Sequence, residues 1–156
     1  MTNNTILRQF RYIFDLSDAQ MVDLFAQAEM IVTKSEVCNW LKKEEEEDYQ
    51  EITDPQLAAL LNGFINHKRG KREGPQPAPE EKLNNNIIFR KLKIALNLKD
   101  TDILDVYAYV KMNISKHEVS AIFRNPSQSQ YRACHDQFLR NFLYGLQLKY
   151  RPKEDS

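Results

Sequence analysis

The sequence predicts an all-α protein made of two tandem four-helix repeats, packed as one helical body with approximate two-fold symmetry. Three observations lead to this prediction. Apolar residues recur at the spacing of amphipathic helices. Only four glycines occur in 156 residues, and the evenly spaced turn signals of a β-sandwich are missing. When the chain is shifted by 82 positions, 18 of the 67 residues in 3–69 are identical to their partners in 85–151, which indicates an internal duplication.

The duplication gives the predicted organisation of the chain. Residues 1–69 form the first four-helix repeat and residues 85–151 form the second. Between them, residues 70–84 contain "GKREGPQPAPEEKL", whose prolines and glycines are typical of a linker. The tail 152–156 is expected to be disordered. Each repeat is small for an independent hydrophobic core, so the two copies are expected to pack together.

The first two helices of each repeat are predicted from their starts and their apolar spacing. The first helix is expected to begin at Asn4 or Asn86, since asparagine is a good N-cap residue. The second is expected to start near Asp18 or Asp100. The predicted buried positions of the first copy are Ile6, Leu7, Phe10, Ile13, Met21, Leu24, Phe25 and Ala28; those of the second are Ile88, Phe89, Leu92, Leu96, Ile103, Val106, Tyr107 and Val110.

The third helix opens with a capping-box pattern in both copies, Thr33-x-x-Glu36 and Ser115-x-x-Glu118. In this pattern the hydroxyl accepts a bond from a free helix amide, and the glutamate accepts one from the cap's own amide. The expected apolar faces consist of Val37, Trp40 and Leu41 in the first copy and Val119, Ile122 and Phe123 in the second.

The fourth helices are "DPQLAALLNGFINHKR" and "DQFLRNFLYGLQLKYR". Asp54 is expected to cap the first of them, with Pro55 at the first helical position. Gly63 and Gly145 occupy the same place in the two copies, although glycine inside a helix costs about 1 kcal/mol relative to alanine. A close approach of another backbone explains them, and we expect each fourth helix to pack against the other fourth helix or against its own first helix.

Composition limits the function classes. The 22 basic and 22 acidic residues balance, which argues against a surface built entirely for nucleic acid but leaves room for one basic face. Cys38 and Cys134 form no CxxC pair, so a zinc site or a disulfide framework is not expected. The N-terminus lacks the apolar run of a signal peptide. We expect a cytoplasmic protein that uses no cofactor or metal and does not enter a membrane.

The segments "NNTILRQFRYIFDLSD", "WLKKEEEEDYQ", "LNGFINHKRGK", "LNNNIIFRKLKIALNLKD" and "DQFLRNFLYGL" resemble the YehS-like family of small bacterial proteins. The resemblance extends over the whole chain except the tail after Arg151. It implies a bacterial cytoplasmic protein built from two copies of a domain of unknown function. It implies no activity.

Helices two and three of each repeat resemble a helix-turn-helix, in which the outward face of the later helix enters the DNA major groove. The spacing of Val32, Val37 and Trp40 is suited to seating the third helix on the second. The outward face offers Lys34, Ser35, Asn39, Lys42 and Lys43 in the first copy and Lys116, His117, Ala121 and Arg124 in the second. Asparagine can pair with adenine and lysine with guanine. Against this, the turn is about one residue longer than usual and lacks a glycine.

The ends of the fourth helices are basic, and "HKRGKR" runs from His67 to Arg72. If both helices end on one side, the cations can form a single patch facing phosphate. That patch consists of Lys68, Arg69, Lys71, Arg72, Lys149 and Arg151. The structural alternative is a solvated helix end whose charges complement the helix dipole. The first helices are basic too, and their cations can pair with the acidic run Glu44–Asp48 inside the protein.

Catalysis is not expected. Consecutive carboxylates such as Glu44 to Glu47 do not converge on one point of a helix, so a metal site there is not expected. Cys134, His135 and Asp136 precede the last helix, where a thiol pKa can be lowered, but adjacent side chains usually point apart. Two readings therefore remain open: a nucleic-acid-binding protein, with duplex DNA as its partner, and a non-enzymatic protein-interaction module or homodimeric adaptor. The second would show an exposed apolar patch.

Overall fold

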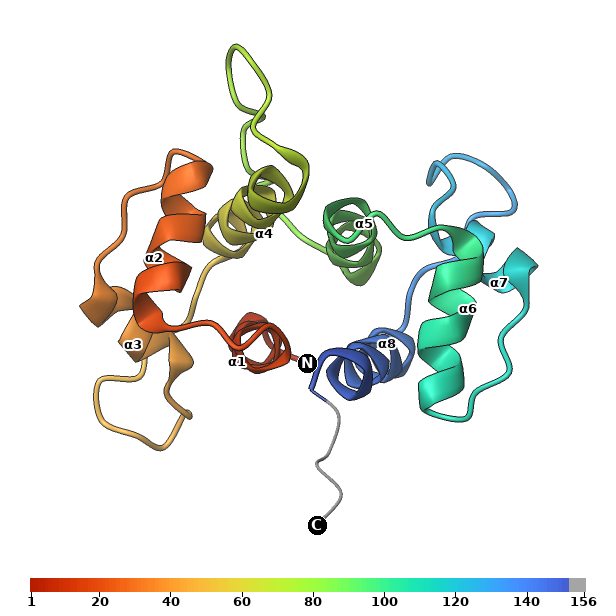
Figure 1. Ribbon diagram of the computed structural model, residues 1–156, viewed down its shortest axis with the longest axis horizontal. Helices are drawn as coiled ribbons and strands as arrows, with labels where there is room; N and C mark the ends of the chain where they lie inside the picture. The colour runs from red at the N-terminus through yellow and green to blue at the C-terminus, as the bar shows by residue number, and fades with distance from the viewer. Residues whose placement is uncertain (152–156) are drawn as a thin grey trace. The chain divides into compact units, whose positions relative to one another are not determined.

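Helices form the regular structure throughout the part of the chain that the computed structural model describes, residues 1–151. The predicted disordered tail, 152–156, lies outside the described residues. The helices fall into two compact units, Met1–Leu83 and a second that starts at Asn84 (Figure 1). The first unit contains α1 (Asn3–Ile13), α2 (Asp18–Gln27), α3 (Lys34–Leu41) and α4 (Asp54–Arg69); the second contains α5 (Asn85–Ala95), α6 (Asp100–Tyr109), α7 (Lys116–Ile122) and α8 (Asp136–Tyr150).

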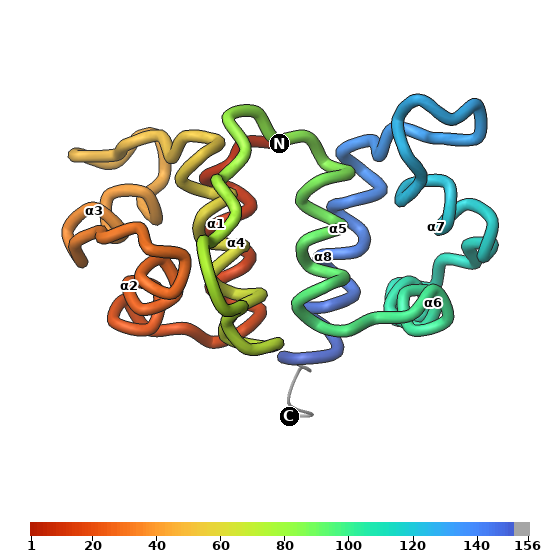
Figure 2. The backbone as a smooth tube through the Cα atoms, turned by 90° about the horizontal axis from the view of Figure 1, so that it is seen from above, coloured from red at the N-terminus to blue at the C-terminus, as the bar shows by residue number. Residues whose placement is uncertain are grey.

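The prediction of an all-α chain with a repeated four-helix unit is confirmed. In each unit the last helix is central: α4 packs along α2 and α1, and α8 packs along α6 and α5. Figure 2 shows the pairs α1 and α4, and α5 and α8, side by side. The third helix of each unit lies against the second. The packing of the two units into one body stays a prediction.

The predicted core positions are buried, apart from residues at helix ends. Leu7, Phe25, Phe89 and Tyr107 are each 0% exposed. Ala28, Leu96, Val110 and Phe123 are only half-buried, because each is the C-cap residue where its helix leaves the core. Leu41, the last residue of α3, is half-buried for the same reason.

The two fourth-helix glycines do mark a close approach of backbones, but the backbone that each of them approaches is not a predicted one. A β-carbon on Gly63 would overlap the carbonyl oxygen of Leu24 and lie 2.7 Å from its carbonyl carbon. A β-carbon on Gly145 would lie 2.5 Å from the carbonyl oxygen of Val106. Each glycine therefore lets the fourth helix touch the main chain of the second helix of its own unit. The first helix is not the neighbour at this point.

The asparagines at the start of the first helices are not the caps that the sequence predicts. Thr2 caps α1 and Asn84 caps α5, while Asn4 and Asn86 lie inside the first turn and are 2% and 6% exposed. The Asn4 side chain donates to the carbonyls of Trp40 (2.9 Å) and Gln50 (2.8 Å) and accepts from the amide of Ile52 (3.2 Å).

Asn86 makes the same three hydrogen bonds in the second unit. It donates to the carbonyls of Ile122 (3.0 Å) and Arg132 (2.8 Å) and accepts from the amide of Cys134 (2.8 Å). The two asparagines therefore fasten the loop between the third and fourth helices to the first helix. We call residues 42–53 the acidic loop and residues 123–135 the arginine loop.

The cap of α4 is also one residue earlier than predicted. Thr53 is the N-cap and forms a capping box with Gln56, so Asp54 is the first helical residue. The Asp54 carboxylate accepts instead from the Asn3 side chain (2.6 Å) and from the amide of Leu83 (2.8 Å). The predicted capping box of Thr33 and Glu36 is present in full.

The segment after α4 is tied to the first unit. Asn66 donates to the Gln76 side chain (2.9 Å), and Gln76 donates to the carbonyl of Arg72 (3.1 Å). With the bond from Leu83 to Asp54, these contacts fold the proline-rich stretch back on the helices that precede it.

Candidate nucleic-acid interface

The predicted outward face of α3 is only partly presented to solvent. Lys34 and Ser35, in the first turn, are exposed, and Asn39 is half-buried. The helix ends at Leu41, so Lys42 is its C-cap and Lys43 lies beyond it. Lys42 is half-buried and Lys43 is exposed. The first turn of α3 therefore offers Lys34 and Ser35 to a partner, and the other three residues lie towards or in the acidic loop.

The predicted face of α7 differs from expectation at Ala121. This residue is 3% exposed, because the arginine loop covers it: the amide of Arg132 donates to its carbonyl at 3.1 Å. Lys116 and His117 are exposed in the first turn. Arg124 lies beyond the end of α7, in the arginine loop. It is half-buried, and its Nε is buried without a hydrogen-bond partner.

The connection between the second and third helices is longer than in a helix-turn-helix, where three or four residues suffice. Here it takes six residues, 28–33, between α2 and α3, and six, 110–115, between α6 and α7. The third helix packs on the second as predicted: Val32, Val37 and Trp40 are buried, and the ring centres of Trp40 and Phe25 lie 5.5 Å apart. The pair is thus a helical corner with a longer turn than the DNA-binding motif.

The basic end of α4 is exposed at each residue predicted to face phosphate, Lys68, Arg69, Lys71 and Arg72. Two of them have partners in the first unit. Lys71 pairs with Glu29 at 3.5 Å, and the Lys68 ammonium lies 5.7 Å from the centre of the Phe64 ring. In the second unit Lys149 is exposed and lies over the ring of Tyr150. The joint patch of both helix ends stays a prediction.

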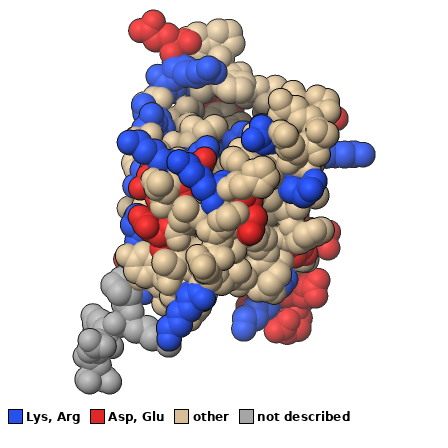
Figure 3. Space-filling view, turned by 90° about the vertical axis from the view of Figure 1, so that its right-hand side faces the viewer, with Lys and Arg blue, Asp and Glu red and all other residues tan. Residues whose placement is uncertain are grey.

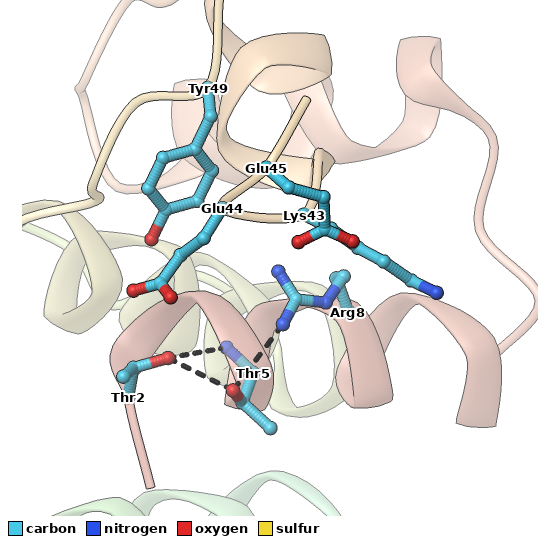
Figure 4. A pocket seen from close by; sticks show the side chains of 7 residues that line it. All are labelled: Thr2, Thr5, Arg8, Lys43, Glu44, Glu45 and Tyr49. Carbon is cyan, nitrogen blue, oxygen red and sulfur yellow. Dashed lines mark hydrogen bonds between the residues drawn. The ribbon is translucent and has the colours of Figure 1, made fainter. Parts of the chain in front are cut away.

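A hollow of about 260 Å³ separates α1 from the acidic loop (Figure 4). Its lining consists of Thr2, Thr5, Arg8, Lys43, Glu44, Glu45 and Tyr49. Arg8 donates to the carbonyl of Lys42 at 3.0 Å, and Figure 4 shows its guanidinium and the carboxylates of Glu44 and Glu45 around the same hollow. Partial burial and then the charges of Glu44 and Glu51 raise the pKa of Tyr49, while Arg8 opposes them. Arg8 lines the hollow together with Glu44 and Glu45, but its side chain donates to the carbonyl of Lys42 and to the hydroxyl of Thr5, so the pairing of a first-helix cation with the acidic run stays a prediction.

The same place in the second unit has the opposite charge. Adding 82 to each position turns Arg8 and Tyr49 into Arg90 and Tyr131, which are retained. All six carboxylates of the acidic loop are lost: Pro126, Ser127, Gln128, Ser129, Gln130 and Ala133 replace Glu44, Glu45, Glu46, Glu47, Asp48 and Glu51. Arg132 takes the place of Gln50. The arginine loop is therefore a cationic version of the acidic loop on the same backbone frame.

This difference extends to the whole unit. Residues 1–83 include ten Lys and Arg and fifteen Asp and Glu, a formal charge of −5. The rest of the chain has twelve and seven, a formal charge of +5. Figure 3 shows Lys and Arg side chains spread over this side of the molecule, with groups of Asp and Glu side chains between them. The zero net charge of the chain is thus the sum of one acidic and one basic unit.

The thiol of Cys134, which is followed by His135 and Asp136, lies in a buried position that does not favour reactivity. Cys134 is 6% exposed, and its Sγ lies 3.7 Å from the carbonyl of His135. Burial, followed by the charge of Asp136, raises the pKa of Cys134 to about 12. The thiol is therefore protonated at neutral pH. Within residues 1–151, no three His, Cys, Asp or Glu side chains gather into a possible metal site, and no helix has the length and hydropathy needed to cross a bilayer.

Thiol reactivity tests this burial. Cys38 is exposed, so the native protein is expected to release one equivalent of chromophore from the reagent DTNB at about pH 8, and two equivalents after denaturation. Because burial raises the pKa of the Cys134 thiol to about 12, very little of it is thiolate at that pH. The variant Cys38→Ser should abolish the native reaction. Rapid reaction of two thiols in the native protein would contradict the buried position of Cys134.

The matches to known proteins follow the two units. A family model described as "Protein of unknown function (DUF1456)" matches the chain twice, over residues 3–70 and 85–151. The chain is also similar to "Uncharacterized protein YehS" of Escherichia coli (strain K12), with 40% identity over 155 residues that cover 99% of both chains. No solved structure matches. The resemblance seen in the sequence is confirmed.

Proposed function

The chain belongs to the DUF1456 family, and on that premise we propose that it is a non-enzymatic cytoplasmic protein that binds nucleic acid, with the second unit making most of the phosphate contacts. The observation that carries the proposal is the basic second unit, in which the exposed first turn of α7 and the arginine loop that follows the end of this helix both carry cations. Cations attract phosphate by releasing its counterions, whatever the base sequence.

The two units differ in the number of carboxylates that lie in sequence near their exposed lysines, and we assign their roles on this basis. In the first unit, Lys34 and Ser35 are exposed, but the six carboxylates of the acidic loop follow the same helix and repel phosphate. In the second unit, Lys116 is also exposed, with Glu118 in the same first turn, and the corresponding loop has no carboxylate. The first turns of α3 and α7 are therefore assigned to base edges or backbone in a groove, and the arginine loop to phosphate.

Salt dependence of binding to random-sequence duplex DNA tests the proposal. Four phosphate contacts would lower the affinity about a hundredfold between roughly 50 and 200 mM salt. Fluorescence anisotropy of a labelled duplex measures this. Absence of binding at the lower salt, or an affinity that does not change with salt, would overturn the proposal.

Two position-matched double variants test the assignment to the second unit. Lys116→Ala with Arg124→Ala removes two cations there, and Lys34→Ala with Lys42→Ala removes their counterparts from the first unit. The first pair should weaken binding about tenfold or more and reduce the salt slope by about two. The second pair should have a clearly smaller effect. Equal effects of the two pairs would contradict the assignment.

The alternative, a protein-interaction module or homodimeric adaptor, has less support. The large apolar side chains that are exposed in residues 1–151 lie on five separate segments: α1, the α2–α3 turn, α5, α6 and α8. The most exposed is Ile31, at 85% in the α2–α3 turn. Single exposed apolar residues are common on monomeric proteins and do not by themselves mark an interface.

A further inference from the structure

We infer that Arg90, Arg124 and Arg132 form a binding site for one phosphate group in the second unit, at the place where the first unit has carboxylates beside its own arginine. The ligand class is a phosphate group, either free or within a nucleotide chain. The inference deepens the proposed function and rests on it only for the second of these sources.

The structure brings the three arginines to the two ends of one loop. Arg90, on α5, donates from Nη2 to the carbonyl of Phe123 at 3.4 Å, which places its guanidinium beside the start of the arginine loop. Arg124 follows Phe123 in the chain. At the other end of the loop, the amide of Arg132 donates to the carbonyl of Ala121 at 3.1 Å. The carbonyls of Ala121 and Phe123 are two residues apart, so the guanidinium of Arg90 and the main chains of Arg124 and Arg132 lie in one small region.

Hydrogen bonds fasten the main chain of the arginine loop at Arg132. Asn86 is 6% exposed and donates to the carbonyl of Arg132 at 2.8 Å, while the amide of Cys134 donates back to Asn86 at 2.8 Å. The backbone of Arg132 is thus fixed on both its amide and its carbonyl side. A fixed backbone lowers the entropy lost when its side chain closes on a ligand.

The three guanidinium groups have unused binding capacity. Among the described residues, none of them makes an ion pair. The bonds of Arg90 and of the Arg132 side chain (3.3 Å to the carbonyl of Tyr131) are made to neutral oxygens. Arg124 has a buried Nε with no hydrogen-bond partner. Arginine donates in a planar fork that matches phosphate oxygens, and such charge-assisted bonds are stronger than bonds to neutral acceptors.

The first unit has carboxylates at the matching place. There the retained arginine, Arg8, lines the hollow together with Glu44 and Glu45 (Figure 4). At the matching positions the second unit has Pro126 and Ser127, and it gains Arg132 where the first unit has Gln50. Loss of the internal anions, together with gain of a cation, leaves a positive site that an external anion can neutralise.

The test is a titration of the ¹⁵N-labelled full chain with inorganic phosphate, followed by NMR, against chloride at matched ionic strength. Phosphate should shift the arginine Nε–H signals and the amide signals of the arginine loop, and chloride should not. Arg132→Gln, which restores the first-unit residue, should weaken phosphate binding about tenfold, the effect of losing one charge-assisted bond. Ser127→Glu, which restores a first-unit carboxylate, should weaken it at least as much.

The matched control is Arg140→Gln, an exposed arginine on α8 that bonds to Gln137 outside the loop. It should bind phosphate like the unchanged protein. Circular dichroism checks that each variant is folded. Equal effects of phosphate and chloride, or equal affinities of Arg132→Gln and Arg140→Gln, would overturn the site.

The same variants separate the site from the proposed function. Phosphate binding that depends on Arg132, without binding of duplex DNA, would retain the site for a free phosphate group and overturn the nucleic-acid function. Salt-dependent binding of DNA that is unchanged by Arg132→Gln and Ser127→Glu would retain the function and overturn the site.

Discussion

Replacing Gly63 by alanine is expected to destabilise the first unit by about 3 kcal/mol, at the upper end of the usual cost of overpacking. Alanine is the better helix former by about 1 kcal/mol, so an unobstructed site would give a change of the opposite sign. The added β-carbon would overlap the carbonyl oxygen of Leu24, a main-chain atom of α2 that cannot rotate away. Urea unfolding followed by far-UV circular dichroism measures the loss.

Gly145→Ala is the matched variant in the second unit. Its β-carbon would lie 2.5 Å from the carbonyl oxygen of Val106 and 2.7 Å from a methyl group of the same residue. Because the methyl group can rotate aside, we expect a smaller loss, about 2 kcal/mol. Gly63→Ala at or above the stability of the unchanged protein would show that α2 moves away from α4, and would remove the explanation given for both glycines.

Asn4→Ala is expected to cost about 3 kcal/mol, because it removes three hydrogen bonds and leaves buried main-chain groups without partners. The amide of Ile52 loses its acceptor, and the carbonyls of Trp40 and Gln50 lose their donor. A buried polar group without a partner costs about 1–3 kcal/mol, and water can reach the part-buried carbonyl of Gln50. Thermal and urea unfolding measure the loss.

The control for this variant is Asn66→Ala. Asn66 is half-buried and also donates two hydrogen bonds, to the carbonyl of Gln27 and to the side chain of Gln76, so a loss of about 1 kcal/mol is expected. Asn4→Asp keeps the shape but turns a carboxylate towards two carbonyl oxygens, and should be at least as damaging as alanine. An Asn4→Ala variant no less stable than Asn66→Ala would refute the fastening role.

Much of the fold can be predicted from the sequence because the duplication supplies every element twice. Helix spacing identifies the buried residues, and the Thr33–Glu36 pair identifies the start of α3. Asn4 was misassigned because asparagine at a helix start is also the commonest kind of cap. The overlooked signal is its position: Asn4 precedes Leu7 by three residues, on the apolar face of α1, and Thr2 is available as the cap.

The candidate interface is less predictable for two physical reasons. The exposure of Lys34 and Lys116 follows from their places in the first helical turn, but the cover over Ala121 depends on the path of a loop, which residue spacing does not determine. The arginine loop was not predicted, because a comparison based on identical residues describes only what the two copies share. Its signal lies in the differences, from Glu44 and Glu45 to Pro126 and Ser127, and from Gln50 to Arg132.

The fastening of each loop by one asparagine has a consequence for how such proteins diversify. The three atoms that Asn4 holds belong to the main chain of Trp40, Gln50 and Ile52, and those that Asn86 holds belong to Ile122, Arg132 and Cys134. Not one of these side chains is shared between the copies, yet the bonds are the same. The side chains of a segment that is anchored only through its peptide groups can be substituted without loss of the anchoring hydrogen bonds. After the duplication, the loop of one copy could therefore acquire a different surface charge while the loop of the other copy kept its own.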